Sequence, residues 1–442
     1  MRKRLLLVAG LLIVVLMAVG LTVAVRLNRG GYLPKPVSVT AGLAPTAVPL
    51  PRRPEAVSSA TVTPLATPLP TETTALPAAT PSVMTPAAPA ALPTRVVAPP
   101  EPLQVPDGFG VSIFAEGLSG PRMMAVGPDG DLYVVERDAN RIIRLPDRES
   151  DGVADAVEVV AAGLGSPSSI AFSVDGFLYV GEPSRVLRLT LSGTPLGAER
   201  VDVIVDGIPT DGHSTRTVLF SPDGAWLYVS VGSSCNVCEE SDPRRATIVR
   251  YRPDGSDEAI YATGLRNAVG ITFRPSTAEL WATNNGRDWL GDDQPPETVY
   301  IVGEGDDAGW PRCHSGRIVD PDFGFAGACE GVVAPAVEMQ AHTAPLGLGF
   351  YTGAAFPEAY HGDLFVALHG SWNRSDPVGY KVLHIPIEDG VPGPVMDFAA
   401  GWLRDDGSQW GRPVDVVTSV DGNLLVSDDG AGRIYRIYYQ VP

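Results

Sequence analysis

The segment DGHSTR carries three side chains whose types suit proton transfer. Asp211, His213 and Arg216 lie within it, directly ahead of a strand-like run that begins VLF. Histidine titrates near neutral pH and a neighbouring carboxylate can orient its ring, so His213 is a candidate general base. A histidine in a surface turn, without a chemical role, is the alternative interpretation.

Two further segments contain groups suited to an anion and to a metal ion. GLRNAVGI places Arg266 beside Asn267, and an arginine followed by an amide suits an anionic or carbonyl-rich ligand. NNGRDWLGDDQPPE combines glycine with carboxylates, which are ligands that Ca²⁺ prefers, although their spacing is not that of an EF-hand. The carboxylates are Asp288, Asp292, Asp293 and Glu297. A capped turn and a solvated acidic loop are the respective alternatives.

Two more segments carry basic and aromatic side chains. ALHGSWNRSDPVGYK contains His369, Trp372, Asn373 and Arg374, and WGRPVD contains Arg412. Arginine and tryptophan together can hold a flat molecule that bears several acidic groups. Either segment alone would more often be structural, so the interpretation depends on a fold that brings all five segments together.

A repeated unit supplies such a fold. A tight turn followed by a strand recurs in GPDGDLYVVE, SVDGFLYVGE, SPDGAWLYVSV, RPSTAELWATNN, HGDLFVALHG and SVDGNLLVSDD, and second strands such as RIIRL follow. Six such units predict an all-β, six-bladed β-propeller, in which loops of successive blades converge on one axis. A β-sandwich is the rival fold, but it does not need six similar units. We expect RIYRIYY, from Arg433, to close the ring by pairing with residues near Phe109 to Phe114.

The chain ahead of the repeats has two parts. An unbroken apolar run over residues 5–25 follows the basic Arg2–Arg4 and is long enough to span a bilayer. It predicts a signal-anchor helix within a membrane anchor of residues 1–31, with the rest of the chain outside the cytoplasm, at the cell surface or in the periplasm. A cleaved signal peptide is the alternative. Residues 32–104 are rich in Pro, Thr and Ala and predict a disordered stalk, which leaves 105–442 for the propeller.

Charge and cysteine content agree with export. The formal net charge of −18 argues against a nucleic-acid partner, which would require a basic face. An even number of cysteines in an exported chain predicts two disulfides, Cys235–Cys238 and Cys313–Cys329. A redox-active C-x-x-C is the alternative for the first pair.

Taken in order, these segments resemble the soluble PQQ-dependent sugar dehydrogenases, which include sorbosone dehydrogenase-like and soluble glucose dehydrogenase-like quinoproteins. The resemblance covers about Val105 to Tyr439. It is carried by HSTRTVLFSPDGAWLYVSVGSSCNVC, GLRNAVGITFRP, ELWATNNGRDWLGDD, AGWPRC, LGLGFYTGAAFP with GDLFVALHGSWNR, and GRPVDV. It implies a six-bladed propeller that uses pyrroloquinoline quinone (PQQ) and Ca²⁺ to oxidise an aldose or sugar aldehyde. A separate electron acceptor would then reoxidise the cofactor.

The resemblance also implies roles for individual residues. His213 matches the general base, and Arg266, counted with it as catalytic, matches a pair with Asn267 beside the quinone. Gly286 and Arg287 match a loop whose backbone carbonyls hold calcium, with Asp288 and Asp293 as further candidate ligands. The other implied cofactor contacts are Thr343, His369, Arg374 and Arg412.

Two other functions are compatible with a propeller. The first is a catalytically inactive extracellular module that binds carbohydrate or protein, which would not need His213, Arg266, Asn267 and Arg412 together. The second is a lactonase-like metal hydrolase, which would need metal ligands from several blades. The carboxylates of this chain lie mainly in one loop, which counts against the hydrolase.

Overall fold

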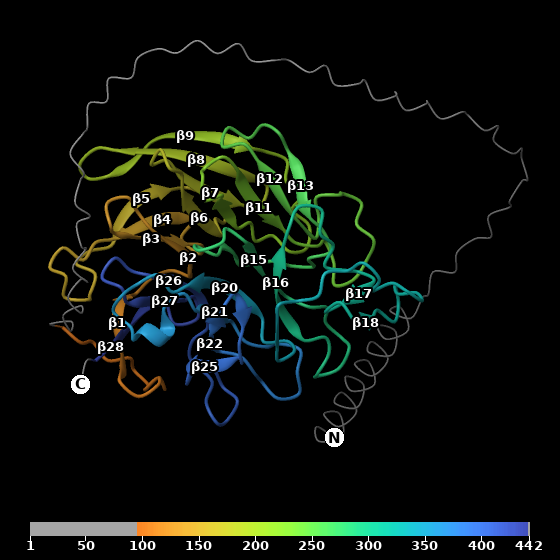
Figure 1. Ribbon diagram of the computed structural model, residues 1–442. Helices are drawn as coiled ribbons and strands as arrows, with labels where there is room; N and C mark the ends of the chain where they lie inside the picture. The colour runs from red at the N-terminus through yellow and green to blue at the C-terminus, as the bar shows by residue number, and fades with distance from the viewer. Residues whose placement is uncertain (1–94, 441–442) are drawn as a thin grey trace, which may run out of the picture. The chain divides into compact units, whose positions relative to one another are not determined.

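The strands form six four-stranded antiparallel sheets, which are the blades of a propeller (Figure 1). This is a computed structural model that describes residues 95–440. In the first three blades the strands are β2 (Pro121–Val126), β3 (Leu132–Glu136), β4 (Arg141–Leu145) and β5 (Glu158–Ala162); β6 (Ser169–Phe172), β7 (Leu178–Glu182), β8 (Arg185–Ser192) and β9 (Gly197–Val205); and β10 (Val218–Phe220), β11 (Leu227–Val231), β12 (Thr247–Tyr251) and β13 (Ala259–Ala262).

The other three blades follow the same order from the centre outward. Their strands are β14 (Ile271–Phe273), β15 (Leu280–Asn284), β16 (Glu297–Val302) and β19 (Val337–Met339); β20 (Pro345–Phe350), β21 (Leu364–Leu368), β22 (Lys381–Ile385) and β25 (Met396–Ala399); and β26 (Pro413–Thr418), β27 (Leu424–Asp428), β28 (Arg433–Tyr439) and β1 (Phe109–Glu116). The smaller elements are the ribbons β17 (Cys313–His314) with β18 (Ile318–Val319) and β23 (Ile387–Glu388) with β24 (Val391–Pro392), and the 3₁₀ helix η1 (Glu358–Tyr360). The predicted all-β, six-bladed propeller is confirmed.

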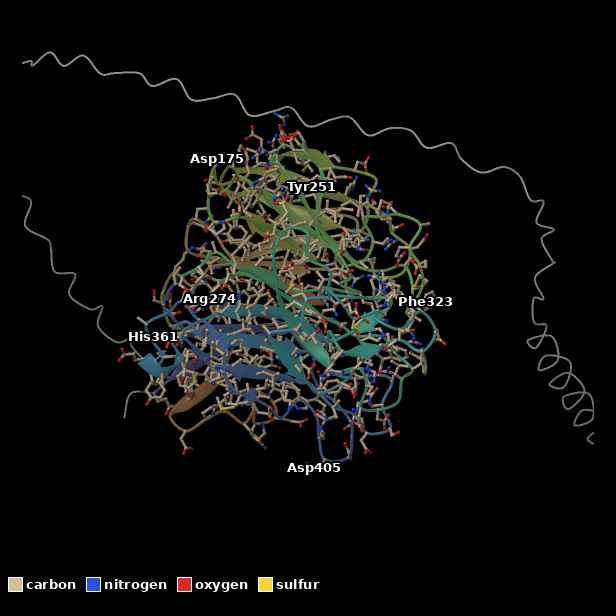
Figure 2. All side chains as sticks on the ribbon, turned by 45° about the vertical axis from the view of Figure 1, so that its right-hand side comes forward. Asp175, Tyr251, Arg274, Phe323, His361 and Asp405 are labelled. Carbon is tan, nitrogen blue, oxygen red and sulfur yellow. A yellow bond between two sulfur atoms is a disulfide. The ribbon has the colours of Figure 1, made fainter. Side chains whose placement is uncertain are left out.

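The repeated turn-and-strand segments build the contacts between blades. In five of the six second strands, all except β27, a leucine is followed by an aromatic residue, so the two point to opposite faces of the sheet. In four of these strands the aromatic residue packs edge-on against the innermost strand of the next blade. Examples are Tyr133 on Phe172 at 4.9 Å and Tyr179 on Phe220 at 4.8 Å between ring centroids. Figure 2 shows side chains filling the spaces between the sheets, where six apolar clusters lie, one between each pair of neighbouring blades.

The ring closes through strands from the two ends of the propeller. Strand β1 pairs with β28 in antiparallel register, with Phe109 opposite Tyr439 and Ile113 opposite Tyr435. The predicted closure by Phe109–Phe114 is therefore confirmed. Residues 95–104, the end of the predicted stalk, already contact the propeller, since Gln104 pairs with Ala400.

We expect Phe109→Ala to destabilise the propeller through this closing strand. The Phe109 ring contacts four other aromatic rings, at centroid distances of 4.8 to 5.2 Å. Removing it should lower the free energy of unfolding by about 3 kcal/mol, as measured by urea denaturation. Phe325→Ala, at a ring that is 57% exposed, is the matched control and should change it by less than about 0.5 kcal/mol. Equal stability of the two variants would contradict a closing role for β1.

The predicted anchor helix over residues 5–25 and the stalk up to residue 94 lie outside the described residues. Within residues 95–440, no helix is long and apolar enough to cross a membrane. Both predicted disulfides, Cys235–Cys238 and Cys313–Cys329, are present.

Candidate active site

The predicted residues gather on the face of the ring where the inner strands begin, which we call the upper face. Three long loops lie there, over residues 232–246, 285–296 and 369–380, each between the second and third strands of a blade. Together with the segments ahead of β10, β14 and β20 they enclose a cavity of about 240 Å³. Its lining includes eight residues that were named from the sequence: His213, Arg266, Asn267, Gly286, Asp288, Glu297, Trp372 and Asn373.

His213 is oriented by the backbone of the loop after β11. Its Nδ1 lies 3.0 Å from both the carbonyl oxygen and the Oγ of Ser233. The carbonyl can only accept, and the Ser233 hydroxyl donates its hydrogen to the Cys235 carbonyl at 2.7 Å, so Nδ1 carries the proton. The lone pair of the neutral imidazole is therefore on Nε2. Burial, reinforced by the positive charge of Arg266, lowers the pKa of His213 to about 4, which keeps the ring neutral at neutral pH.

A close backbone approach brings His213 and Asn267 together. A Cβ atom built on Gly232, which follows strand β11, would lie 2.6 Å from the Cβ of His213 and 2.7 Å from the Oδ1 of Asn267. Real Cβ atoms do not approach other atoms so closely, so only glycine fits between the two side chains. The local requirement for Gly232 thus places the candidate base beside the candidate amide ligand.

The other two members of the DGHSTR segment have different surroundings. Asp211 is exposed and makes no hydrogen bond to His213 in the described structure, so Ser233 orients the histidine in place of the carboxylate. Arg216 is fully buried and donates to the carbonyls of His213, at 2.9 Å, and Thr215. It holds the backbone that carries His213 and does not line the cavity.

Arg266 forms one wall of the cavity and is fixed by all three of its guanidinium nitrogens. It is 5% exposed and donates to the Gly286 carbonyl at 2.7 Å and to the Asp288 carboxylate at 2.9 Å. It also donates to the backbone carbonyl of Asn236 at 2.9 Å and to its side-chain oxygen at 3.0 Å. The arginine thus links three segments of the upper face as a buried, oriented positive charge.

Asn236 was not predicted from the sequence, yet it connects these segments. It lies between Cys235 and Cys238, so the disulfide closes the short loop that presents it. Its side chain exchanges two hydrogen bonds with the backbone of Asp288, at 2.7 and 3.0 Å, in addition to accepting from Arg266. The disulfide therefore acts here as part of the scaffold that positions Arg266 and Asp288.

The candidate calcium ligands do not form an open set. The Gly286 carbonyl accepts from Arg266, and the two oxygens of Asp288 accept from Arg266 and from Asn373. The side chain of Arg287 does not line the cavity and forms a buried ion pair with Asp320, in the segment between β16 and β19 that the Cys313–Cys329 disulfide closes. The Asp293 carboxylate is 90% exposed and 3.3 Å from Arg374.

The remaining predicted cofactor contacts surround the cavity without lining it. Thr343 is fully buried and donates its hydroxyl to the Gln340 carbonyl, while its neighbours on either side face the cavity. Arg374 donates to the backbone of Asp292 and so ties the loop 369–380 to the loop 285–296. His369 pairs with Asp429 at 2.8 Å, and Arg412 donates to the His369 carbonyl at 3.1 Å. These last two residues belong to a separate polar cluster between the fifth and sixth blades.

Two further ionisable residues line the cavity: Glu297, one of the carboxylates of the candidate calcium loop, and His342, which was not predicted from the sequence. Glu297, the first residue of β16, is 3% exposed and accepts from the Gly286 amide at 2.7 Å. Burial raises the pKa of this carboxyl to about 7. His342 donates from Nε2 to the Gly291 carbonyl at 2.9 Å, and its Nδ1 accepts from the Asn373 side-chain amide at 3.3 Å. The acidic segment over residues 284–297 identified Glu297 from the sequence, whereas nothing local marked His342.

The chain is similar in sequence to a known protein family and to individual members of other organisms. The sequence profile of the TrAA12-like family matches residues 103–315 and 325–440, most of the chain. The chain is 37% identical over 234 residues to an uncharacterized protein of Borreliella burgdorferi, covering 52% of this chain and 61% of that protein. It is 26% identical over 407 residues to a pyrroloquinoline quinone-dependent pyranose dehydrogenase of Coprinopsis cinerea, covering 76% of this chain and 54% of that protein. The chain thus spans less than two thirds of the length of these curated relatives.

Solved structures agree on the fold. The holo form of the PQQ domain of Coprinopsis cinerea pyranose dehydrogenase superposes with a TM-score of 0.69 at 24% identity, over 78% of this chain and 99% of that one. The calcium structure of a Trichoderma reesei carbohydrate-active enzyme of family AA12 gives 0.67 at 22% identity, over 79% and 99%. At these identities the likeness establishes the shared propeller.

Proposed function

The chain belongs to the TrAA12-like family, whose relatives are PQQ-dependent sugar dehydrogenases, and from this premise we propose that its propeller oxidises an aldose or a sugar aldehyde with PQQ. The name of the Coprinopsis cinerea relative favours a substrate in its pyranose form. The observation that carries the proposal is the neutral His213, whose unprotonated Nε2 belongs to a cavity walled by the buried Arg266.

The chain's own residues account for the proton transfer. Nε2 of His213 accepts the proton of a substrate hydroxyl while a hydride leaves the carbon that bears this hydroxyl. As the ring gains its charge, Nδ1–H keeps its bonds to Ser233, so the imidazole does not rotate during the transfer. PQQ, when bound, supplies the acceptor of the hydride. A separate electron acceptor then receives the two electrons.

The lining fits a flat, anionic cofactor. Arg266 provides a buried positive charge, and Asn267 provides an amide on the same side as His213. The Oδ1 of Asn373 is buried and has no hydrogen-bond partner within the described structure, so it can accept from an N–H or O–H group of a bound molecule. We propose that Arg412, His369, Thr343 and Arg374 support the cofactor from the rim, as the family resemblance implies.

The residues of the cavity fit Ca²⁺ less well than they fit a flat, anionic cofactor. A cation at the Gly286 carbonyl would lie beside the guanidinium of Arg266, whose NH1 is 2.7 Å from that oxygen. Like charges at this distance repel, so the backbone carbonyls of Gly286 and Arg287 would bind Ca²⁺ only after Arg266 releases the first of them. We therefore propose that this loop binds Ca²⁺ once the side chain of Arg266 has shifted. No chemical step is derived from the ion.

The proposed function is tested by reconstitution. The purified full chain would be incubated with PQQ, with Ca²⁺, with both, or with neither, and dye reduction followed with a panel of aldoses and sugar aldehydes. We expect sugar-dependent dye reduction whenever PQQ is present, and an effect of Ca²⁺ on its extent. PQQ binding without turnover on any sugar would exclude the proposed substrate class. No binding of PQQ would leave the propeller as a binding module.

The pH dependence of the reaction should report the histidine. Because the neutral imidazole is the active form and its pKa is lowered to about 4, kcat/KM should stay level as the pH falls through 6 and decline only near pH 4. An unperturbed histidine would give a decline near 6.5. A decline near pH 7 that Glu297→Gln abolishes would instead identify Glu297, whose pKa is raised to about 7, as the titrating base.

The location of the enzyme is also a proposal. Two disulfides among the described residues suit an oxidising compartment, outside the cytoplasm. We propose that the propeller works there, at the cell surface or in the periplasm, on the anchor predicted over residues 1–31.

A further inference from the structure

Two exposed tryptophans stand at the mouth of the cavity. Of the seven tryptophans, all within the described residues, only Trp289 and Trp372 are exposed, at 69% and 65%. Their rings meet edge to face, with centroids 5.4 Å apart and an angle of 83° between planes. Trp372 also lines the cavity, so the pair continues the site outward. Large exposed aromatic surface of this kind usually marks a site of interaction.

The two rings are held in place by bonds between their loops. Asn373, next to Trp372, donates to the Asp288 carboxylate at 2.8 Å, and Asp288 directly precedes Trp289. The Ser375 amide donates to Asp292 at 3.1 Å and reinforces the same connection. Trp289 has a backbone φ of +74°, a left-handed conformation that is unfavourable for a bulky residue and that tends to persist at functional sites. The two exposed indole rings are therefore held in fixed positions relative to each other.

We propose that Trp289 and Trp372 form an aromatic platform that binds a second pyranose ring, so that the preferred substrate is a neutral disaccharide or longer saccharide. This rests on the proposed function. The C–H groups on one face of a pyranose complement the negative face of an indole ring. The cavity, at about 240 Å³, is below the range of about 300–1,000 Å³ that is typical for drug-sized ligands. A flat cofactor would fill most of it, and the sugar would extend to its mouth, where the platform lies.

The charges around the platform favour a neutral saccharide over an acidic one. The exposed carboxylate of Asp293 and the carboxylate of Asp292 lie in the same loop as Trp289. They can accept hydrogen bonds from sugar hydroxyls, whereas they would repel the carboxylates of a uronic acid polymer. The occupant to which the platform is best suited is therefore an uncharged chain of pyranose rings.

The test compares substrates of increasing length. For the full chain reconstituted with PQQ, kcat/KM would be measured for glucose, cellobiose and cellotriose, and for maltose and maltotriose. We expect one of the two series to show higher kcat/KM for the disaccharide than for glucose. The ratio of disaccharide to glucose should fall about 3- to 10-fold in Trp372→Ala and in Trp289→Ala, the size expected for loss of one aromatic contact. In Trp372→Phe, the ratio should lie between the values of Trp372→Ala and the wild type.

Trp226→Ala is the matched control. Trp226 is also partly exposed, but it lies in the turn before β11, away from the upper face, where Arg252 stacks on it at 3.8 Å. This variant should leave the ratio unchanged. Equal ratios in all variants would contradict the platform, and so would a rise in KM for the electron acceptor alone, which would assign the tryptophans to acceptor docking.

A second readout does not depend on turnover. Titrating cofactor-free protein with cellotriose and, separately, with maltotriose should change the tryptophan fluorescence of the wild type with at least one of them. The change should be lost in Trp372→Ala and Trp289→Ala. If no sugar is oxidised but this signal is present, the proposed function fails and the platform stands. If sugars are oxidised but the signal is absent and the ratios are equal, the platform fails and the proposed function stands.

Discussion

His213→Ala should lower kcat by about 10²- to 10⁴-fold while PQQ still binds with an affinity within a few-fold of the wild type. The expected loss is large because the substitution removes the proposed general base. Nδ1 of His213 is fixed by Ser233 at 3.0 Å, which leaves Nε2 for the substrate. Steady-state dye reduction gives kcat, and a spectroscopic titration with PQQ gives the affinity.

His361→Ala provides the control for this substitution. His361 lies beside the 3₁₀ helix between β20 and β21, away from the upper face, and its ring contacts the Phe356 carbonyl at 3.0 Å (Figure 2). Its loss should leave kcat unchanged. Full activity of His213→Ala would show that another group accepts the proton, with Glu297 as the first alternative because it lines the same cavity.

Arg266→Ala should have the second large effect, on stability as well as on PQQ binding. Its removal takes one donor from the Asp288 carboxylate and one from each of the Gly286 and Asn236 carbonyls. Asn373 still donates to Asp288, and Trp310 still donates to the Asn236 carbonyl, so the uncompensated charge is the main cost. Breaking a buried ion pair by removing one partner costs about 3–5 kcal/mol. We therefore expect a marked drop in the unfolding midpoint and loss of detectable PQQ binding. Differential scanning calorimetry and the PQQ titration measure these two effects separately.

The control is a more exposed arginine–aspartate pair. Arg312 donates to Asp307 at 2.7 Å, with its side chain 38% exposed and outside the cavity. Arg312→Ala should cost about 0–1 kcal/mol and leave PQQ binding unchanged. Arg266→Lys separates charge from geometry, because lysine keeps the charge but cannot make the same set of directed bonds. If Arg266→Lys binds PQQ like the wild type, the charge alone is sufficient and the bonded network is dispensable.

The blades could be predicted from the sequence because their signals are local. Each Asp-Gly type turn and each alternating strand is specified within about ten residues, and the segments RIIRL and TIVRY begin at the residues where β4 and β12 begin. Closure of the ring could be predicted as well, since the last strand needs a partner and, within residues 95–440, β1 is the strand that precedes the first complete blade. The disulfides followed from the number and spacing of the cysteines.

The contacts of the site could be predicted only in part. His213, Arg266 and Asn267 were found because the repeat does not need them, and the structure does bring them together. The partner of His213 was not found. Asp211 is two residues away, but Gly212 turns the chain with φ +73°, and the bond goes to Ser233 in a loop that follows another strand.

Asn236 shows the same limit more clearly. Its contacts join segments that are 30 and 52 residues apart in the chain, and an asparagine between two cysteines has no local pattern that reveals such partners. The same applies to Trp289 and Trp372, which meet only because loops of adjacent blades are bonded to each other. Local patterns predict elements, whereas the site depends on which loops the closed ring places side by side.

Oxidation of sugar by the PQQ-loaded propeller is tested most directly without dye. Protein loaded with PQQ would be mixed with an excess of sugar in a stopped-flow instrument, and the absorbance of the bound cofactor followed. We predict that the sugar reduces one equivalent of PQQ per protein, and that the rate of this reduction falls by about 10²- to 10⁴-fold in His213→Ala. Bound PQQ whose absorbance stays unchanged with every aldose, sugar aldehyde and oligosaccharide tested would contradict it.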